Sequence, residues 1–517
     1  MTDASMIDAR AVDPARVPVI VGVGQVEDRE PDPFAARDSL GLMVDALHAA
    51  DADAGGGWLA EVDSLDVVDQ ISFRDLNPLV DPLAAALGMS PARRAQTAMP
   101  MGDSPVRLLN EAANRIGAGE TRVAAIVGAE ALRTAARRAA ARAGGGEADH
   151  NAMRARHRDR APDYRQRYGL VAPVDIYPLY ENATRSAWGQ SLAQAQAESA
   201  AIWADFSVVA AANPHAWLRT PRTAAEIATP TADNRRIAFP YAKLMVANSS
   251  VNQGAGFLVT SLAHARARGI PDARLVHVGH GAAAHEPDDI LARDGYAASA
   301  GMRVSLEATL RLNALEIADV DHVELYSCFP CVPKMARRVI GWPLARAMSV
   351  VGGLTFGGGP IGNYMSHAIA AMVDRLRGDG ATRAQAVGLL FGNGGVATHN
   401  HSIVLSAAAL PGTRFPRQTD YQAQADALRA AAPRVDPDYD GDGIVETYTL
   451  FYDRTGAPRA GVVVALNPAG CRFLARVQAG DAATIAFLTD GVADPIGTRG
   501  IARRAADGLV DWTIGAA

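Results

Sequence analysis

AMSVVGGLTFGGGPIGNYMSHAIAAMV, residues 347–373, carries no Asp, Glu, Lys or Arg. Such a stretch is long enough to cross a bilayer as a helix. Its first part, however, is broken by closely spaced glycines and by Pro360, and Asn363 follows directly. Backbone of that kind is not tolerated where lipid surrounds it. The stretch therefore predicts a buried glycine-rich loop that leads into a helix over residues 363–376, and no membrane span is expected.

The segments around this loop alternate between short β-branched runs and longer segments of helical period, which is typical of an α/β sheet. The first succession comprises residues 19–23, 39–50, 64–68, 106–116 and 122–127. The second comprises residues 256–265, 274–278, 302–312, 323–326, 363–376, 386–390 and 402–407. Because the two successions are similar, we predict a duplicated α/β core.

Residues 131–240 and 412–517 interrupt this alternation. We predict an N-terminal half over 1–130 and 241–265, an inserted loop domain over 131–240, a C-terminal half over 266–410, and an additional small β-rich domain over 412–517. In that last domain the pattern predicts a helix over 420–432 and strands over 444–452, 461–466 and 484–488.

Composition is that of an ordinary globular protein. Lys+Arg 50 and Asp+Glu 56 give 50 − 56 = −6, with 49% hydrophobic and 21% charged residues. This balance argues against disorder and against nucleic-acid binding. Three cysteines are too few to stabilise a chain of 517 residues through disulfide bonds. The N-terminus also has no secretory signal pattern. We therefore expect a cytoplasmic protein.

No bound cofactor or metal ion is predicted. Gly22 and Gly24 close a strand, but the third glycine of a dinucleotide fingerprint falls on Glu27, whose carboxylate would repel a pyrophosphate. Cys328 and Cys331 have the spacing of a zinc pair but lack a second pair, so they are predicted to be buried free thiols.

Five motifs, in their order along the chain, resemble the thiolase superfamily over residues 17 to about 408. They are the strand end at 126–130, Asn-Pro-x-Ala-Trp at 213–217, Phe-Pro-Tyr-x-Lys-Leu-Met at 239–245, the glycine loop at 357–362 and the turn at 391–395. The set is most similar to thiolase-like proteins of actinobacterial type labelled acetyl-CoA acetyltransferase. The resemblance implies a duplicated five-layered αβαβα core, an inserted loop domain that usually holds coenzyme A, and a small OB-like C-terminal domain.

The same resemblance implies that the usual reactive side chains are replaced. Gly102 stands where active thiolases carry the nucleophilic cysteine, in a turn that reads Met-Gly-Asp-Ser-Pro at 101–105. Gly359 replaces the activating histidine, and Gly392 replaces the acid/base cysteine. Tyr326 replaces the histidine of the His-Asp-Cys-Phe motif. Acyl-cysteine chemistry is therefore not expected.

Several polar groups near these loops are candidates for a different role. The catalytic candidates are Tyr326, His367 and His399, because a phenol or an imidazole can donate or accept a proton. We expect the backbone N–H groups of Gly102 and Gly394 to form an oxyanion site. Ser104, Asn363 and Asn393 are candidate substrate-binding residues. For each side chain, a purely structural role is the alternative.

The resemblance implies a protein that acts on or binds acyl-CoA thioesters in lipid metabolism, with coenzyme A or acyl-CoA as ligand. An acyltransferase is the activity that the family label implies. Two alternatives stay open: a non-catalytic acyl-CoA-binding or partner protein, and a tyrosine-dependent CoA-thioester C–C lyase. The protein is expected to be a monomer or a homodimer.

Overall fold

The computed structural model describes residues 13–143, 162–380, 383 and 385–515. Nine core strands follow the order β3-β2-β4-β7-β1-β8-β11-β10-β9. The first half contributes β1 (Pro18–Glu27), β2 (Ser64–Val67), β3 (Arg93–Gln96), β4 (Val123–Ala131) and β7 (Asn252–Ser261). The second contributes β8 (Val276–His285), β9 (His322–Leu325), β10 (Val387–Gly394) and β11 (His399–Ser406).

The two halves repeat one pattern of strand pairing. In the first, β2 is parallel to β4, β4 is antiparallel to β7, and β7 is antiparallel to β1. In the second, β9 is parallel to β10, β10 is antiparallel to β11, and β11 is antiparallel to β8. In the described part of the sheet, the halves pair at two residue positions, at the ends of β1 and β8. The predicted duplicated α/β core is confirmed.

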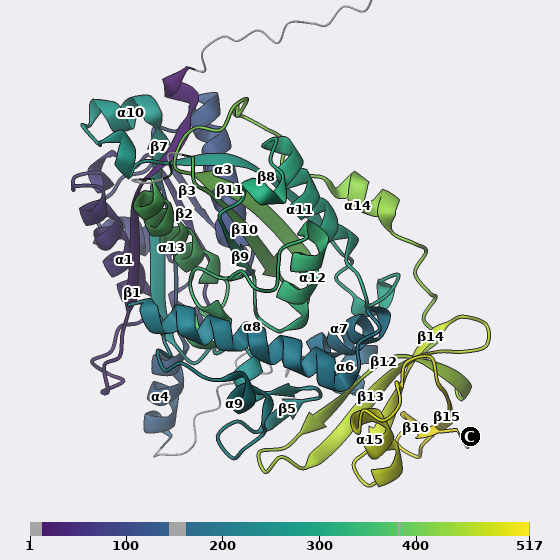
Figure 1. The fold of residues 1–517 in the computed structure, drawn as a ribbon. Coiled ribbons are helices and arrows are strands. Elements are labelled where there is room, and N and C mark those ends of the chain that lie inside the picture. The colour runs from purple at the N-terminus through teal and green to yellow at the C-terminus, as the bar shows by residue number, and fades with distance from the viewer. Residues whose placement is uncertain (1–12, 144–161, 381–382, 384, 516–517) are drawn as a thin grey trace, which may run out of the picture.

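Helices complete five layers (Figure 1). The central layer is α3 (Ser104–Ala118) and α13 (Tyr364–Asp379), which both contact strands of both halves. The outer layers contain α1 (Ser39–Asp53) and α2 (Val80–Ala86) on one side and α11 (Ala300–Leu312) and α12 (Cys331–Ile340) on the other. The glycine-rich run is buried over 348–360, contains a π-helical turn at Gly353–Gly357, and then enters α13. Among the described residues, no helix is long and apolar enough to span a membrane.

The segment between β4 and β7 adds a helical cover. It contains α4 (Leu132–Arg142), α6 (Tyr164–Arg167), α7 (Pro173–Ala187), α8 (Leu192–Ala212), α9 (Ala224–Ala228), β5 (Arg236–Ala238) and β6 (Tyr241–Ala242). Figure 1 shows α8 lying across the core below the strand ends. The strand predicted over 256–265 ran too far, because Ser261 caps α10 (Leu262–Ala267) by accepting a hydrogen bond from the His264 N–H.

The C-terminal part is a small β-barrel. It contains β12 (Gly441–Tyr452), β13 (Pro458–Leu466), β14 (Arg472–Gln478), β15 (Arg499–Arg504) and β16 (Val510–Ile514). The strand order β13-β14-β16-β15-β12, closed by pairing of β12 with β13, is that of an OB-fold barrel. β5 of the inserted segment pairs with β12 at its edge.

One predicted strand of this barrel is wrong. Residues 484–488 lie in α15 (Ala482–Thr489), where the Asp481 side chain accepts a hydrogen bond from the Thr484 N–H. A short apolar run such as Thr-Ile-Ala-Phe-Leu does not distinguish a strand from a buried helix. The cap at Asp481 and the two alanines after it favour the helix.

The barrel and its linker are bonded to the core at several places, which include the linker before α14 and Arg472. Before α14 (Gln422–Leu428), the linker pairs with β8: the Ala283 N–H donates to the Thr419 carbonyl at 2.7 Å, and the Tyr421 N–H donates to the Ala283 carbonyl at 2.9 Å. The buried Arg472 donates from one guanidinium nitrogen to the carbonyls of Leu291 and Arg293, each at 2.6 Å. These hydrogen bonds therefore hold the barrel against the core.

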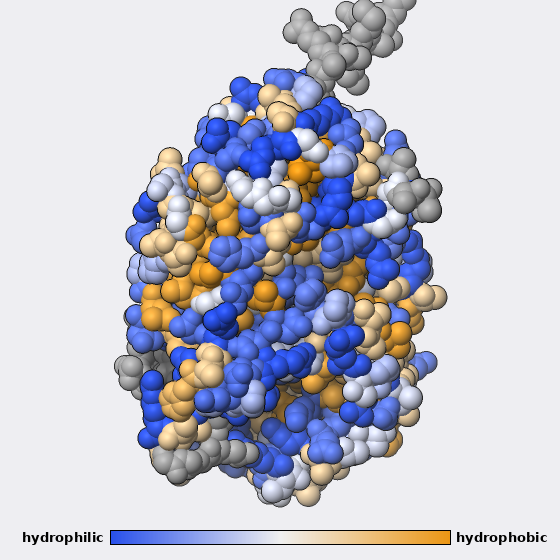
Figure 2. Space-filling model, turned by 90° about the vertical axis from the view of Figure 1, so that its left-hand side faces the viewer, coloured by the Kyte–Doolittle hydropathy of each residue, from blue (hydrophilic) through white to orange (hydrophobic). Residues whose placement is uncertain are grey.

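Figure 2 shows the face that lies to the left in Figure 1. Hydrophilic side chains are spread over most of this face, and hydrophobic side chains form smaller patches between them. Such a mixture is usual for a protein surface. This face therefore gives no indication of a dedicated apolar binding surface.

Candidate functional site

Tyr326 occupies the volume that a side chain at residue 102 would need. A Cβ atom built on Gly102 would lie 2.6 Å from Tyr326 Cζ and nearer still to the Tyr326 hydroxyl and the Asn393 carbonyl. The Tyr326 N–H donates to the Phe391 carbonyl at 3.1 Å and so extends the β9–β10 pairing by one residue. This register places the phenol against the turn that precedes α3.

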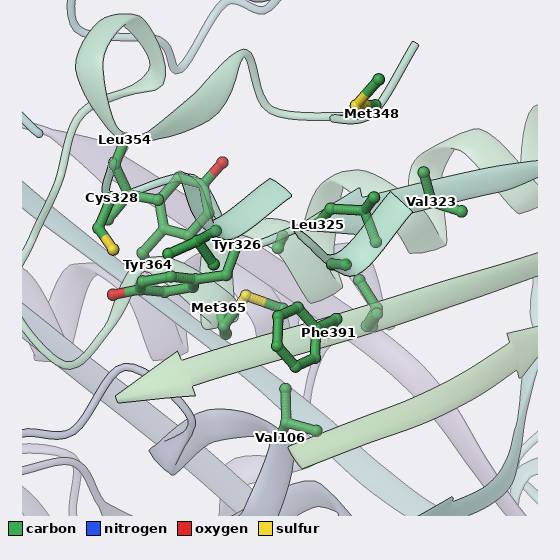
Figure 3. Packing of buried hydrophobic residues seen from close by; sticks show 14 of the residues in the cluster. Val106, Val323, Leu325, Tyr326, Cys328, Met348, Leu354, Tyr364, Met365 and Phe391 are labelled. Atoms are coloured by element: carbon green, nitrogen blue, oxygen red, sulfur yellow. The ribbon is translucent and has the colours of Figure 1, made fainter. Parts of the chain in front are cut away.

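The phenol of Tyr326 lies in a buried aromatic and thiol environment. Its ring meets the Tyr364 ring edge-on at a centroid distance of 5.7 Å. Figure 3 shows both rings beside Cys328, with Phe391 of β10 close by. Burial raises the pKa of Tyr326 well above its usual range, and the neighbouring Cys328 and Asp103 add to this shift. Tyr326 is therefore a hydrogen-bond donor at neutral pH.

Asp103 is the buried carboxyl group of the site. It is 3% exposed and packs against β10, where Cβ atoms on Gly392 and Gly394 would lie 3.0 Å from Asp103 Cα and 2.7 Å from Asp103 Oδ1. Its Oδ1 has no hydrogen-bond partner in the described parts of the chain. Burial raises the pKa of Asp103, although nearby His399, His285 and Arg107 oppose the shift. The sequence places Asp103 in the turn at 101–105, but nothing in its spacing marks it for a role.

His399 lies at the outer edge of the same group. It begins β11, pairs with Gly394 of β10, and its ring meets that of His285 at a centroid distance of 4.6 Å. His399 Nε2 lies 3.9 Å from Asp288 Oδ1. Of the three catalytic candidates, Tyr326 and His399 are therefore the two that interact electrostatically with Asp103.

His367 contacts a different part of the molecule. Its Nδ1 lies 3.0 Å from Gln25 Oε1 on β1. Burial lowers the pKa of His367 to about 3, and nearby His215 adds to the shift. A neutral imidazole held against the N-terminal strands favours the structural role over an acid/base role.

The three candidate substrate-binding residues have protein partners. Asn363 donates to the Gly128 carbonyl at 2.5 Å and accepts from Ser366 Oγ at 2.7 Å. Asn393 donates to Asn400 Oδ1 at 2.9 Å and accepts from the Tyr177 hydroxyl at 3.2 Å. Ser104 Oγ accepts from the Met101 N–H at 3.3 Å. These bonds brace the loops around Tyr326.

The Gln253 side chain occupies the space beside the glycine loop at 357–362. No sequence motif predicts a role for Gln253. Gly358 has φ +104°, and a Cβ atom there would lie 2.8 Å from Gln253 Cδ. Gln253 Nε2 donates to the carbonyls of Gly357 at 2.9 Å and His215 at 3.1 Å. Gly359 donates its N–H to the Asn248 carbonyl at 2.8 Å. The loop therefore presents backbone and an amide where the resemblance implies a histidine.

The thiols near the site are not nucleophiles in this environment. Cys328 and Cys331 are buried and unpaired, as predicted. Burial raises the pKa of Cys328 to about 12, so it holds its proton at neutral pH. Over the described ranges, no three His, Cys, Asp or Glu side chains are grouped as metal ligands would be.

A cavity of about 260 Å³ lies away from these loops, between the α7–α8 turn and the barrel. Its lining includes Arg185, Tyr448 and Asp494. The Arg185 guanidinium is bonded to Asp494 Oδ1 at 2.6 Å, so its charge is already neutralised. We regard the strand-end loops as the functional site, because the replaced reactive positions and the unpaired carboxyl of Asp103 meet there.

The layered duplication, with strand-end glycine turns meeting the start of a central helix, defines a thiolase-fold protein. The chain has the thiolase fold, and both its C-terminal part and its overall structure resemble thiolase-like protein type 1. Residues 422–505 match the family described as the additional C-terminal domain of thiolase-like protein type 1. The chain is 29% identical to a monomeric SCP2-thiolase-like protein type 1 from Mycobacterium smegmatis, with a TM-score of 0.81, over 98% of this chain and 100% of that chain.

Other similar structures share the fold alone. The Ltp2-ChsH2(DUF35) aldolase matches with 19% identity and a TM-score of 0.58, over 76% of this chain and 98% of that chain. Human mitochondrial 3-ketoacyl-CoA thiolase matches with 14% identity and a TM-score of 0.57, over 77% of this chain and 100% of that chain. No curated protein matches the chain.

Proposed function

We propose that the protein binds a coenzyme A thioester at the loops around Tyr326 and forms no acyl-enzyme. The observation that carries the proposal is the position of Tyr326, whose ring fills the space beside Gly102. Acyl transfer through the enzyme requires a nucleophilic side chain. Gly102 has none, and the thiol of Cys328 is buried and protonated.

The thioester end of the proposed ligand is neutral and presents a carbonyl oxygen. The Tyr326 hydroxyl and the backbone N–H groups of Gly102 and Gly394 are the proposed donors to this oxygen. Gly102 and Gly394 are adjacent, since a Cβ atom on Gly394 would lie 3.1 Å from the Gly102 nitrogen. The thiolase fold supports coenzyme A as ligand. No resident cofactor is part of the proposal, and the cytoplasmic location stays a prediction.

Asp103 favours a second candidate, a tyrosine-dependent C–C lyase acting on 3-hydroxyacyl-CoA. Cleavage of this kind needs an acceptor for the hydroxyl proton and a donor to the developing enolate oxygen. Asp103, in its ionised form and with its unpaired Oδ1, would be the acceptor, and Tyr326 would be the donor. The electron pair of the broken C–C bond would move toward the thioester carbonyl, and the released fragment would leave as an aldehyde or ketone. The proton taken up by Asp103 would then return to the enolate carbon, which gives the shortened acyl-CoA.

The experiment is a mass-spectrometric time course of the full chain with acyl-, 3-ketoacyl- and 3-hydroxyacyl-CoA esters, with and without free coenzyme A. We expect retained ligand and an unchanged protein mass. An acyl adduct on the protein, or no retained ester, would contradict the binding proposal. Cleavage of the 3-hydroxyacyl ester that is lost in Tyr326→Phe would establish the lyase. Tyr452→Phe, at a buried barrel tyrosine, is the matched control.

We also propose that the protein is a monomer. The similar Mycobacterium smegmatis protein, which matches along nearly the whole chain, is described as monomeric. Size-exclusion chromatography with light scattering should give the mass of one chain, 54.2 kDa. Twice that mass would contradict the proposal.

A further inference from the structure

Tyr326, Asp103, His399 and Asp288 form a row in the sense that each side chain is an electrostatic neighbour of the next. Tyr326 is 8% exposed and Asp103 is 3% exposed. The side chain of His399 is 29% exposed, and that of Asp288 is 91% exposed. The exposed fraction therefore rises from Asp103 through His399 to Asp288.

Glycines make the close approach within this row possible. Asp103 Oδ1 packs on Gly394, which pairs with His399 across β10 and β11. A side chain at residue 394 would separate Asp103 from the strand pair. His399 Nε2 in turn lies 3.9 Å from Asp288 Oδ1, a gap that one water molecule or a small side-chain rotation closes.

Asp103 Oδ1 is a buried oxygen without a hydrogen-bond partner in the described ranges. Burial of a carboxyl oxygen without a partner is unfavourable, and such an oxygen in a native protein calls for an explanation such as a water molecule or a catalytic role. The ionisable groups that face Asp103 are Tyr326 from the end of β9, Arg107 from α3, His399 from β11 and His285 from β8. Those that face the two histidines are Asp288 and Asp420.

We propose that Asp103, His399 and Asp288 form a path that carries protons between the Tyr326 site and solvent. A proton that leaves the Asp103 carboxyl is taken up by a ring nitrogen of His399. The resulting imidazolium releases a proton to water beside Asp288, and the reverse sequence reloads Asp103. The biological role of this path depends on the proposed function, because the path would serve a ligand that gains or loses a proton at Tyr326. It exists in the ligand-free protein, so it can be tested without coenzyme A.

The test uses infrared spectroscopy of the full chain at neutral pH. The carbonyl stretch of protonated buried carboxyls should be present, and the component from Asp103 should be lost in Asp103→Asn, whereas the component from Glu130, whose pKa burial raises to about 8, should remain. After transfer to D2O, the rate at which the Asp103 component shifts reports proton exchange at Asp103. We expect His399→Gln to slow the exchange by about tenfold or more, equivalent to about 1.4 kcal/mol in the barrier.

His264→Gln is the matched control, because His264 is also a partly exposed histidine beside a carboxylate, 2.9 Å from Glu61, but lies on α10. Its exchange rate should equal that of the native chain. If His399→Gln does not fold, Asp288→Asn at the exposed end provides the test and should also slow exchange. Unchanged rates in the folded variants, or no band sensitive to Asp103→Asn, would overturn the path. Failure to bind coenzyme A esters would leave these results unaffected and would contradict the proposed function alone.

Discussion

Arg472 of the barrel and Glu446 on the neighbouring β12 form an ion pair at the boundary with the core, with Arg472 Nε donating to Glu446 Oε2 at 2.8 Å. The same guanidinium also donates to two core carbonyls, at Leu291 and Arg293. Arg472 is completely buried. The Arg472 side chain therefore helps to connect the barrel to the core. Its removal would leave the Glu446 carboxylate and two core carbonyls without their donor.

Arg472→Ala is expected to destabilise the attachment of the barrel by about 3 to 5 kcal/mol, because breaking a buried pair leaves an uncompensated charge. Limited proteolysis should cut the linker between core and barrel earlier than in the native chain, and the thermal midpoint should fall. Arg499→Ala, at an exposed barrel position, is the control and should leave both unchanged. Equal proteolysis rates for the two variants would show that Arg472 is not required for attachment.

Gly102→Ala should destabilise the core by about 1 to 3 kcal/mol, since the added methyl would overlap the Tyr326 ring and the Asn393 carbonyl. Urea denaturation measures the change. Gly480→Ala is the control, because a Cβ atom there meets nothing within 4 Å. It should stay within about 0.5 kcal/mol of the native value. An equally small effect at Gly102 would mean that Tyr326 moves aside at little cost.

His401 should make the protein sensitive to acid. Asn110 Nδ2 lies 2.7 Å from His401 Nε2, and burial lowers the pKa of His401 to about 3 from its usual 6.5. Since the folded-state pKa is depressed, the unfolded chain binds a proton first as the pH falls. This contribution to stability is complete above about pH 6.5 and is lost progressively toward pH 3, by roughly 1.4 kcal/mol per pH unit.

The measurement is the free energy of unfolding against pH for the native chain and His401→Gln, whose amide can still accept from Asn110. The acid slope should be shallower in the variant by about one proton between pH 6 and 4. His48→Gln, at an exposed position on α1, should keep the native slope. Parallel curves for the native chain and His401→Gln would contradict the assignment.

Sequence reasoning predicted the fold well because local periodicity carries that information. The two successions of strands and helices, and the entry of the glycine loop into α13 after Asn363, could all be read from short segments. Residues 484–488 were predicted wrongly because five apolar residues fit either element, and the decisive cap at Asp481 lies outside the run.

The site could be predicted only in part, because its geometry depends on contacts between distant segments. The replacement of the expected cysteine by Gly102 is visible in the sequence. The filling of that space by Tyr326 follows from the register of β9 beside β10, which no local pattern encodes. Asn363 and Asn393 have the right chemistry for a ligand, but their bonds to neighbouring loops could not be foreseen.

Restoring the cysteine alone should not restore acyl transfer. In Gly102→Cys the new side chain must enter space that Tyr326 and the Asn393 carbonyl already occupy. The turn also lacks the partner histidine and the second cysteine, since Gly359 and Gly392 stand there. Incubation of Gly102→Cys with an acyl-CoA ester, followed by intact-protein mass spectrometry, should therefore show no acyl adduct. An adduct in Gly102→Cys that is absent from the native chain would mean that Tyr326 yields its place and that the loops alone suffice to activate a thiol.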